Sequence, residues 1–238
     1  MQPEVVKRPR DEEGGHADED TRVQPQRRAF RVGLVSGVRH ADVLPVNAGR
    51  AALVDGLIES LDLAGLERIP AAPCAWSNLE LFHEPAYLAA LQREAPDERF
   101  GLAFDGHPFA GLAEHCKSVA GATLCAVQWL LRATRDEKAA AVALNWHGGR
   151  HHARAAEASG WCFVNDAALA MLLLRRGGLS RLAYFDMDVH AGDAVEEVSS
   201  DVPFLFLFCL SVSLLCHPLC FALLSLTLGR RATRTCCT

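Results

Sequence analysis

The 238-residue sequence lacks an excess of basic side chains: 24 lysines and arginines stand against 29 aspartates and glutamates, for a net charge of −5. Proteins that hold nucleic acid on a basic surface have the opposite balance, so we expect no direct nucleic-acid binding. The chain also lacks the composition of a disordered protein, because half of its residues are hydrophobic. Its length predicts one large domain, or at most two small ones, at roughly 150 residues per domain.

An apolar leader and a regular cysteine pattern are absent as well. The first fifteen residues contain no apolar stretch of the secretory kind, so we expect no export. Five of the nine cysteines lie in the last thirty residues, and the other four are Cys74, Cys116, Cys125 and Cys162. None of these four forms a CxxC pair, whereas zinc ribbons and disulfide frameworks need regular spacings. The sequence therefore predicts an intracellular protein with reduced thiols.

Composition divides the chain into three parts. Residues 1–29 are rich in charged side chains and predict a disordered tail, in which residues 7–10 (KRPR) are a weak candidate for a nuclear import signal. Residues 30–198 alternate short apolar runs with amphipathic ones and form the predicted domain. Residues 203–228, inside the tail 199–238, carry no acidic or basic side chain except His217, and hydropathy alone predicts a transmembrane helix there.

The middle part predicts an α/β fold. Strands are expected over 31–36, 140–145 and 181–189, and helices over 47–61, 79–91, 108–131 and 163–176. Leu53, Leu57 and Leu61 share one face of the first helix; Pro85 predicts a helix start, and Gly121 a break in the long helix. Nearly continuous apolar strands that alternate with helices favour a parallel sheet covered on both faces, a three-layer α/β/α arrangement.

One polar motif, FDMDVHAGD, follows an apolar strand at residues 185–193. Side chains alternate along a strand, so Asp186, Asp188 and His190 are expected to share one side. Two close carboxylates are costly to bury unless a cation neutralises them, and an Asp with a His at i, i+2 suits a divalent metal. The alternative is a polar strand end that is merely solvated.

A second motif, NWHGGRHHARAAEASGWCFVND, follows another expected strand at residues 145–166. His151 and His152 should therefore reach the same edge of the sheet, where imidazoles suit acid–base chemistry. Asp186 and Asp193 are available to fix the tautomer of such a histidine. Taken alone, a His-His pair is more often a surface or structural feature.

Together with three further blocks, at residues 40–58, 79–91 and 101–108, these motifs resemble the zinc-dependent histone deacetylase family, on its class I side. The resemblance covers roughly residues 31–198. It implies a fold related to that of the arginases, with a narrow tunnel that leads to zinc. It also implies hydrolysis of the acetamide of N6-acetyl-lysine, with acetylated histone tails or other acetyl-lysine proteins as substrates.

The resemblance gives roles to individual residues. Those implied to do the chemistry are the zinc ligands Asp188 and His190, the catalytic histidines His151 and His152, and their carboxylate partners Asp186 and Asp193. Those implied around the tunnel are Asp105 at the rim, Gly160 and Trp161 on the wall, and Arg50 near an internal acetate exit. His152 is the expected general base, and Asp186 also matches a site for a structural monovalent cation such as K⁺.

The resemblance also implies a nuclear protein that represses chromatin, also found in the cytoplasm, with a corepressor complex as a partner and no membrane association. Two alternatives stay open: a truncated, non-catalytic deacetylase paralogue, and an acetylpolyamine amidohydrolase. A membrane-anchored binding module and an arginase are weaker alternatives still.

Departures from the family pattern set a further expectation. Ala191 stands where the family usually has a second histidine, and after residue 197 the resemblance stops. The family's third zinc ligand, an Asp, and its oxyanion-stabilising Tyr would follow that point. Residues 199–238 are predicted to be a translated intron, because pyrimidine-rich codons encode such a run and Val198-Ser199 fits a splice donor. We therefore expect the 238-residue form to have no measurable deacetylase activity.

Overall fold

The computed structural model describes residues 30–135, 140–190, 192–200 and 205–209. The charged tail 1–29, Ala191 and most of the apolar run 203–228 lie outside these residues, so the expectations about them stay predictions. Within the described part, no helix combines the length and the apolar character needed to cross a membrane.

The strands form two parallel sheets. The first has the order β2-β1-β3, with β1 (Phe30–Ser36) between β2 (Leu66–Pro70) and β3 (Ala140–Leu144). In its register, Val32 of β1 lies opposite residue 66 of β2 and residue 142 of β3. The second sheet pairs β4 (Leu182–Asp186) with β5 (Leu205–Cys209). Parallel strands joined through helices confirm the predicted α/β class.

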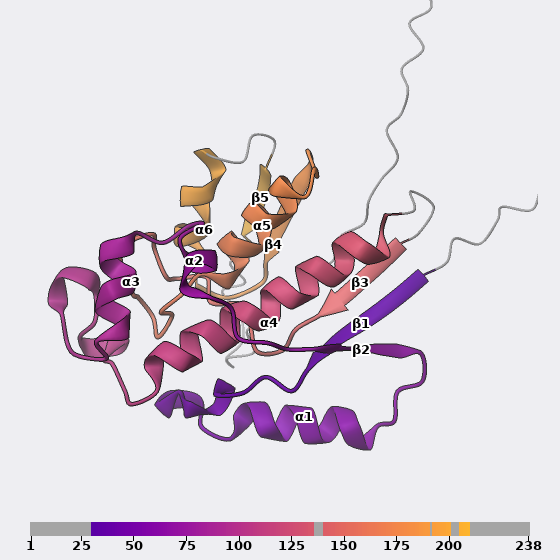
Figure 1. The fold of residues 1–238 in the computed structure, drawn as a ribbon, viewed down its shortest axis with the longest axis horizontal. Helices are drawn as coiled ribbons and strands as arrows, with labels where there is room; N and C mark the ends of the chain where they lie inside the picture. Colours follow the sequence, from indigo (N-terminus) through magenta and orange to yellow (C-terminus); the bar gives the residue numbers. More distant parts are fainter. Residues whose placement is uncertain (1–29, 136–139, 191, 201–204, 210–238) are drawn as a thin grey trace, which may run out of the picture.

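Helices lie on both sides of the three-stranded sheet (Figure 1). The structure has α1 (Arg50–Ser60), α2 (Trp76–Leu79), α3 (Pro85–Gln92), α4 (Leu112–Ala133), α5 (Asp166–Arg176) and α6 (Asp193–Glu196). Short 3-10 segments lie at Ala41–Val43, Pro45–Asn47, Glu98–Phe100, Phe104–Gly106 and Glu197–Ser200. The long helix α4 contacts all three strands of the sheet and packs against α5, while α1 runs along the opposite side. As expected from its fixed φ, Pro85 begins a helix.

The predicted break at Gly121 is wrong, because α4 continues through it. A Cβ at residue 121 would lie 2.1 Å from the carbonyl oxygen of Ala72, so the glycine is needed where another backbone segment crosses the helix. That segment also donates the Cys74 amide to the carbonyl of Lys117, at 3.0 Å. Gly121 thus marks a close approach of two backbones rather than the end of a helix.

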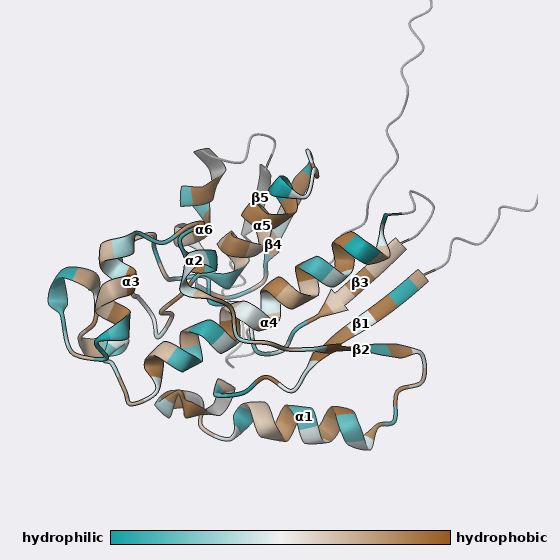
Figure 2. Cartoon of the chain, viewed as in Figure 1, coloured by the Kyte–Doolittle hydropathy of each residue, from teal (hydrophilic) through white to brown (hydrophobic). Residues whose placement is uncertain are grey.

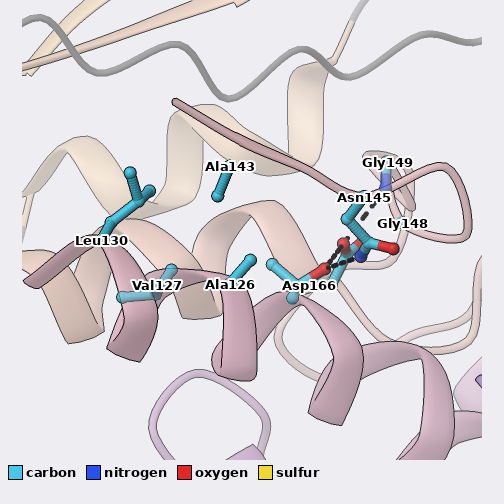
Figure 3. Close-up of a pocket in the computed structure, with 9 residues that line it drawn as sticks. Ala126, Val127, Leu130, Ala143, Asn145, Gly148, Gly149 and Asp166 are labelled. Atoms are coloured by element: carbon cyan, nitrogen blue, oxygen red, sulfur yellow. Dashed lines mark hydrogen bonds between the residues drawn. The ribbon is translucent and has the colours of Figure 1, made fainter. Parts of the chain in front are cut away.

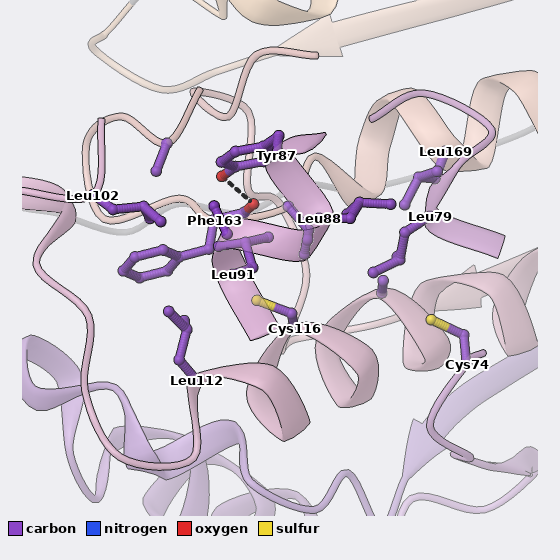
Figure 4. Close-up of a cluster of buried hydrophobic side chains, with 14 of the residues drawn as sticks. Cys74, Leu79, Tyr87, Leu88, Leu91, Leu102, Leu112, Cys116, Phe163 and Leu169 are labelled. Carbon is purple, nitrogen blue, oxygen red and sulfur yellow. Dashed lines mark hydrogen bonds between the residues drawn. The ribbon is translucent and has the colours of Figure 1, made fainter. Parts of the chain in front are cut away.

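The main core lies between α3, α4, α5 and the loops that precede α5 (Figure 4). Its fully buried members include Leu79, Tyr87, Leu91, Leu112 and Phe163. The hydroxyl of Tyr87 donates to the carbonyl of Phe163 at 2.7 Å, so the one polar atom of that side chain is satisfied. This core fixes the segment 150–165 against α3 and α4, and that segment carries the histidine motif.

Coverage of the second sheet is less complete than predicted. On β4 the side chains at residues 182, 184 and 186 are buried, while Phe185 on the other face is 55% exposed. Leu53 and Leu57 of α1 lie one turn apart, with Leu61 directly after the helix, but Leu53 is 76% exposed and Leu57 is 60% exposed. Figure 2 shows brown, apolar segments alternating with teal, polar ones along α1. The described residues therefore leave two apolar surfaces open to solvent.

Candidate active site

The motif at the end of β4 forms a series of turns rather than a continued strand. The strand ends at Asp186, so the expectation of a strand to residue 189 is wrong. Asp186 Oδ1 accepts the amide of Asp188 at 3.0 Å, and Asp188 Oδ1 accepts the amide of His190 at 2.8 Å. Asp side chains favour such bonds to the backbone two residues on, which bend the chain. These turns bring Asp186, Asp188 and His190 close together, whereas the alternation of a continued strand would only place them on one side.

Asp186 and His151 form the buried part of the site. His151 Nδ1 lies 2.6 Å from Asp186 Oδ2, and the hydroxyl of Tyr184 donates to the same oxygen at 2.9 Å. Burial alone would raise the pKa of the Asp186 carboxyl, but the bonds from His151, the Asp188 amide and Tyr184, with the charge of His151, together lower it. An ionised carboxylate only accepts hydrogen bonds, so His151 carries a proton on Nδ1.

His152 lies between His151 and His190. Its ring centroid is 4.0 Å from that of His151 and 5.8 Å from that of His190, the latter in an edge-to-face arrangement. A Cβ at Gly160 would lie 2.7 Å from His152 Cδ2, and Gly160 has φ +53. Only a glycine leaves this space and adopts this backbone conformation without strain. The predicted wall residue Gly160 therefore lies directly behind the predicted base.

Asp188 and His190 bring two metal-type donors together. Asp188 Oδ1 and His190 Nδ1 are 2.9 Å apart, with the His190 side chain 72% exposed and that of Asp188 10% exposed. A carboxylate oxygen and an imidazole nitrogen suit zinc in kind. Among the described residues, no group of three potential ligands was found. The residues present therefore fit part of a zinc site.

The predicted rim residue Asp105 contacts the wall. Its Oδ2 accepts the amide of Gly160 at 3.1 Å, and Asp105 is an exposed residue of a 3-10 segment. Trp161, the other predicted wall residue, follows with φ 58, an uncommon conformation for a bulky residue. Arg50 begins α1 and is exposed. Asp193 begins α6, and its side chain lies outside the described part of the chain.

A polar network that sequence reasoning missed supports the Gly-rich loop before His151 (Figure 3). Asp166 Oδ2 accepts from the hydroxyl of Thr123 at 2.5 Å and the amide of Gly149 at 3.1 Å, and Oδ1 accepts the amide of Arg150 at 2.7 Å. Asn145 donates to the Thr123 hydroxyl at 2.8 Å. A cavity of about 20 Å³, room for about one water, adjoins the network. The Asn-Asp pair that precedes a helical run was the available signal, since such residues cap helices.

The sequence of this chain matches a known protein family. The family model described as the histone deacetylase domain matches residues 44–211, well over half of the chain. The chain belongs to the histone deacetylase family. The predicted resemblance is thereby confirmed. The match runs past residue 198, and the predicted boundary there, with the predicted origin of residues 199–238, stays a prediction.

Relatives in this family are histone deacetylases from animals, plants and fungi. Histone deacetylase 8 of Danio rerio is 37% identical over 172 residues, 68% of this chain and 44% of the relative. Histone deacetylase 3 of Oryza sativa subsp. japonica is 35% identical over 64% of this chain and 31% of the relative. Histone deacetylase clr6 of Schizosaccharomyces pombe is 36% identical over 64% and 39%. The chain thus spans less than half the length of these relatives, and their names favour neither alternative function.

Proposed function

We propose that this chain supplies the histidine and carboxylate part of an active site that hydrolyses N6-acetyl-lysine in histones or other proteins. The observation that carries the proposal is the position of His152, whose ring contacts the Asp186-bound His151 in a tilted arrangement and His190 of the metal-type pair edge-on. Amide hydrolysis needs a base for the attacking water and an acid for the leaving amine. Two adjacent imidazoles with one fixed by a carboxylate meet that need.

In this proposal the two histidines divide the proton transfers. Asp186 holds His151 with its proton on Nδ1 and stabilises the positive charge that the pair acquires. His152 is the base, because it lies between His151 and His190, and it later donates the same proton to the lysine nitrogen. Asp193 is proposed as a second carboxylate partner. The buried position of His151, which is 4% exposed, keeps bulk water from competing for these protons.

Zinc is the proposed cofactor, held on this chain by Asp188 Oδ1 and His190 Nδ1. When bound, zinc polarises the amide carbonyl and lowers the pKa of a water molecule. To bind zinc, His190 Nδ1 would have to lose its contact with Asp188 and be unprotonated. Its lone pair would then be available beside the Asp188 carboxylate. A monovalent cation such as K⁺ near Asp186 remains part of the proposal. Because both oxygens of that carboxylate already accept hydrogen bonds, the backbone would supply most of its ligands.

The rim of the site is proposed to bind the substrate backbone. Asp105 uses part of its acceptor capacity on Gly160, and a carboxylate has about four acceptor positions. Its exposed side chain can therefore accept peptide amides that flank the acetyl-lysine. Gly160 and Trp161 would line the path of the neutral acetyl-lysine side chain. The proposed setting is the nucleus, with the cytoplasm as a second location and a corepressor complex as a partner.

A chimera tests the function most directly. Residues 44–198 of this chain would replace the matched segment of the Danio rerio histone deacetylase 8, and acetate release would be measured from an acetylated histone peptide and from acetylspermidine. We expect turnover of the peptide, a loss of at least about a hundredfold in His152→Ala, and no loss in the exposed-surface control Gln128→Ala. A folded, zinc-loaded chimera without peptide turnover would show the proposal to be wrong.

The 238-residue chain alone is a second arm of this test. Two donors bind zinc weakly, so we propose that this form shows no measurable acetate release. Robust turnover that His152→Ala abolishes would overturn this expectation about the form, while supporting the roles of the histidines.

A further inference from the structure

Asn165 lies at the junction between the histidine motif and α5, and its side chain is bonded on both sides. Its Oδ1 accepts the amide of Ala168 at 2.9 Å, which caps the helix. Its Nδ2 donates to the carbonyl of Ala153 at 3.0 Å and lies 3.5 Å from the carbonyl of His151. The residue is fully buried. One face of this amide therefore starts a helix, and the other holds the backbone that carries the catalytic histidines.

The next residue, Asp166, holds the same segment with the opposite polarity. Its carboxylate accepts the amides of Gly149 and Arg150, immediately before His151. The pair thus contacts the segment 149–153 at four backbone groups, two amides on one side and two carbonyls on the other. Because both amides and carbonyls of this loop are hydrogen-bonded, its backbone has little freedom to rotate. The directions in which the His151 and His152 side chains extend from it are therefore fixed.

We propose that Asn165 is a positioning residue for the catalytic histidine pair, acting through the backbone of residues 151–153 while Asp166 holds residues 149–150. The inference rests on the proposed function only for the role of the histidines; the clamp itself is a property of this chain. Helix capping alone does not explain the residue, because Asp or Ser would cap α5 equally well. The carbonyls of His151 and Ala153 need a donor, and the amide supplies a donor and an acceptor together.

A third contact explains why this amide cannot swing away. The backbone amide of Asn165 donates to His83 Nε2 at 3.0 Å, and His83 Nδ1 lies 3.1 Å from the carbonyl of Arg154. His83 therefore accepts at Nε2 and donates at Nδ1, as a neutral imidazole does. Burial favours that neutral form. The loop before α3 thus holds the backbone of Asn165, and α5 holds its side chain.

The decisive substitution is Asn165→Asp in the full 238-residue chain. It keeps the cap on α5 and the size of the side chain, but it replaces the donor by an oxygen that faces two carbonyls. We expect hydrogen exchange of the His151 amide, which bonds to Gly149, to become at least about tenfold faster. We also expect the NMR signal of the His151 Nδ1 proton, now beside Asp186, to broaden or disappear.

Asn78→Asp is the matched control. Asn78 Oδ1 accepts the amide of Ala75 in the first turn of α2, so this change also converts a capping amide into a carboxylate, at an exposed position outside the histidine loop. We expect it to leave the His151 exchange rate and the Nδ1 signal unchanged. An equal effect of the two substitutions would show that added charge, not the lost donor, is responsible, and would overturn the proposal.

Two further results of this experiment bear on the role of Asn165. If circular dichroism shows that Asn165→Asp does not fold, Asn165→Ser, which caps the helix without adding charge, takes its place with the same expected tenfold change. Unchanged exchange and an unchanged Nδ1 signal in a folded variant overturn the proposal. In the active chimera, Asn165→Asp should lower kcat by more than it raises KM. Exchange decides the clamp even if the chimera is inactive, so the two proposals can fail separately.

Discussion

The two parts of the site differ in how completely this chain determines them. The His151–Asp186 pair is buried, and its carboxylate accepts three hydrogen bonds from side chains and backbone. The Asp188–His190 pair lies a few residues further along the same segment, yet the His190 side chain is 72% exposed. The contacts of the buried pair therefore come from several parts of the chain. The exposed pair is bonded within its own turn, and the His190 ring also contacts that of His152.

This contrast follows from where each pair lies relative to β4. Asp186 is the last residue of the strand, and the core beneath it supplies Tyr184 and the histidine loop. Asp188 and His190 lie beyond the strand, where their backbone bonds are local. The carboxylate at the strand end is thus fixed by groups of the sheet and the core, whereas the proposed ligand pair beyond it is fixed by bonds within its own turn.

The largest expected effect concerns pH and two buried histidines outside both pairs, His83 and His115. Burial lowers the pKa of His83 to about 4, and burial, with a smaller contribution from the charge of Arg150, lowers that of His115 to about 4. Both pKa values rise to about 6.5 on unfolding, so the unfolded chain binds more protons below pH 6.5. The free energy of unfolding should therefore fall as the pH drops from 6.5 to 4, by about 5 kcal/mol in total.

Urea unfolding at several pH values measures this dependence. His83→Gln keeps an acceptor for the Asn165 amide but does not titrate, and it should remove about half of the fall. His115→Gln is the parallel variant and should remove the other half. A stability that stays constant from pH 7 to pH 4 would contradict the assignment of neutral buried histidines.

The next effect compares the two pairs directly. Asp186→Ala removes a buried acceptor shared by the Tyr184 hydroxyl and His151 Nδ1, so it should lower the free energy of unfolding by about 3 kcal/mol. His190→Ala removes an exposed side chain and should cost less than about 0.5 kcal/mol. Urea unfolding of both variants at pH 7.5 measures the difference, and equal losses would remove the distinction between the two pairs.

A smaller effect is expected where the wall contacts the base. Gly160→Ala adds a Cβ 2.7 Å from His152 Cδ2 at a backbone φ of +53, which should cost about 2 kcal/mol. Gly178→Ala is the control, because its φ is also positive and nothing lies within 4 Å of the added atom. Only the change at Gly160 should shift the NMR signals of the His152 ring, and a similar shift in both variants would argue against direct contact.

The smallest effect tests the exposed pair. Zinc at about ten times its Kd should raise the free energy of unfolding by about 1.4 kcal/mol. Asp188→Asn should weaken this binding by at least about tenfold, measured by calorimetry. Glu98→Gln, an exposed acid in a separate 3-10 segment, should leave it unchanged. Zinc binding that survives Asp188→Asn would place the metal elsewhere on the chain.

Sequence patterns predicted the elements well where local chemistry decides them. Pro85 begins α3 and Arg176 ends α5 before a glycine pair, both as expected. Gly121 shows the limit, since the same residue type marks a helix break or a close backbone approach, and only the position of Ala72 distinguishes them. Exposure of Leu53 could not be predicted either, because periodicity shows that apolar residues share a face but not what covers it.

For the site, the motifs identified the groups that touch one another but not those that hold them. His151, Asp186, Asp188 and His190 were predicted and lie together. Asn165 and Asp166 close the same motif in the sequence, yet their roles depend on backbone groups a dozen residues away. Their hydrogen-bond partners are backbone groups, which every residue type carries, so no sequence pattern marks the partner residues.

The double use of Asn165 has a consequence for how the domain opens and closes. Its carbonyl oxygen belongs to the first turn of α5 and its amide nitrogen to the histidine loop, so neither can detach alone. Fraying of that helix end releases the loop, and release of the loop uncaps the helix. The two form a single cooperative opening unit, in which amides that are distant in the sequence exchange their protons together.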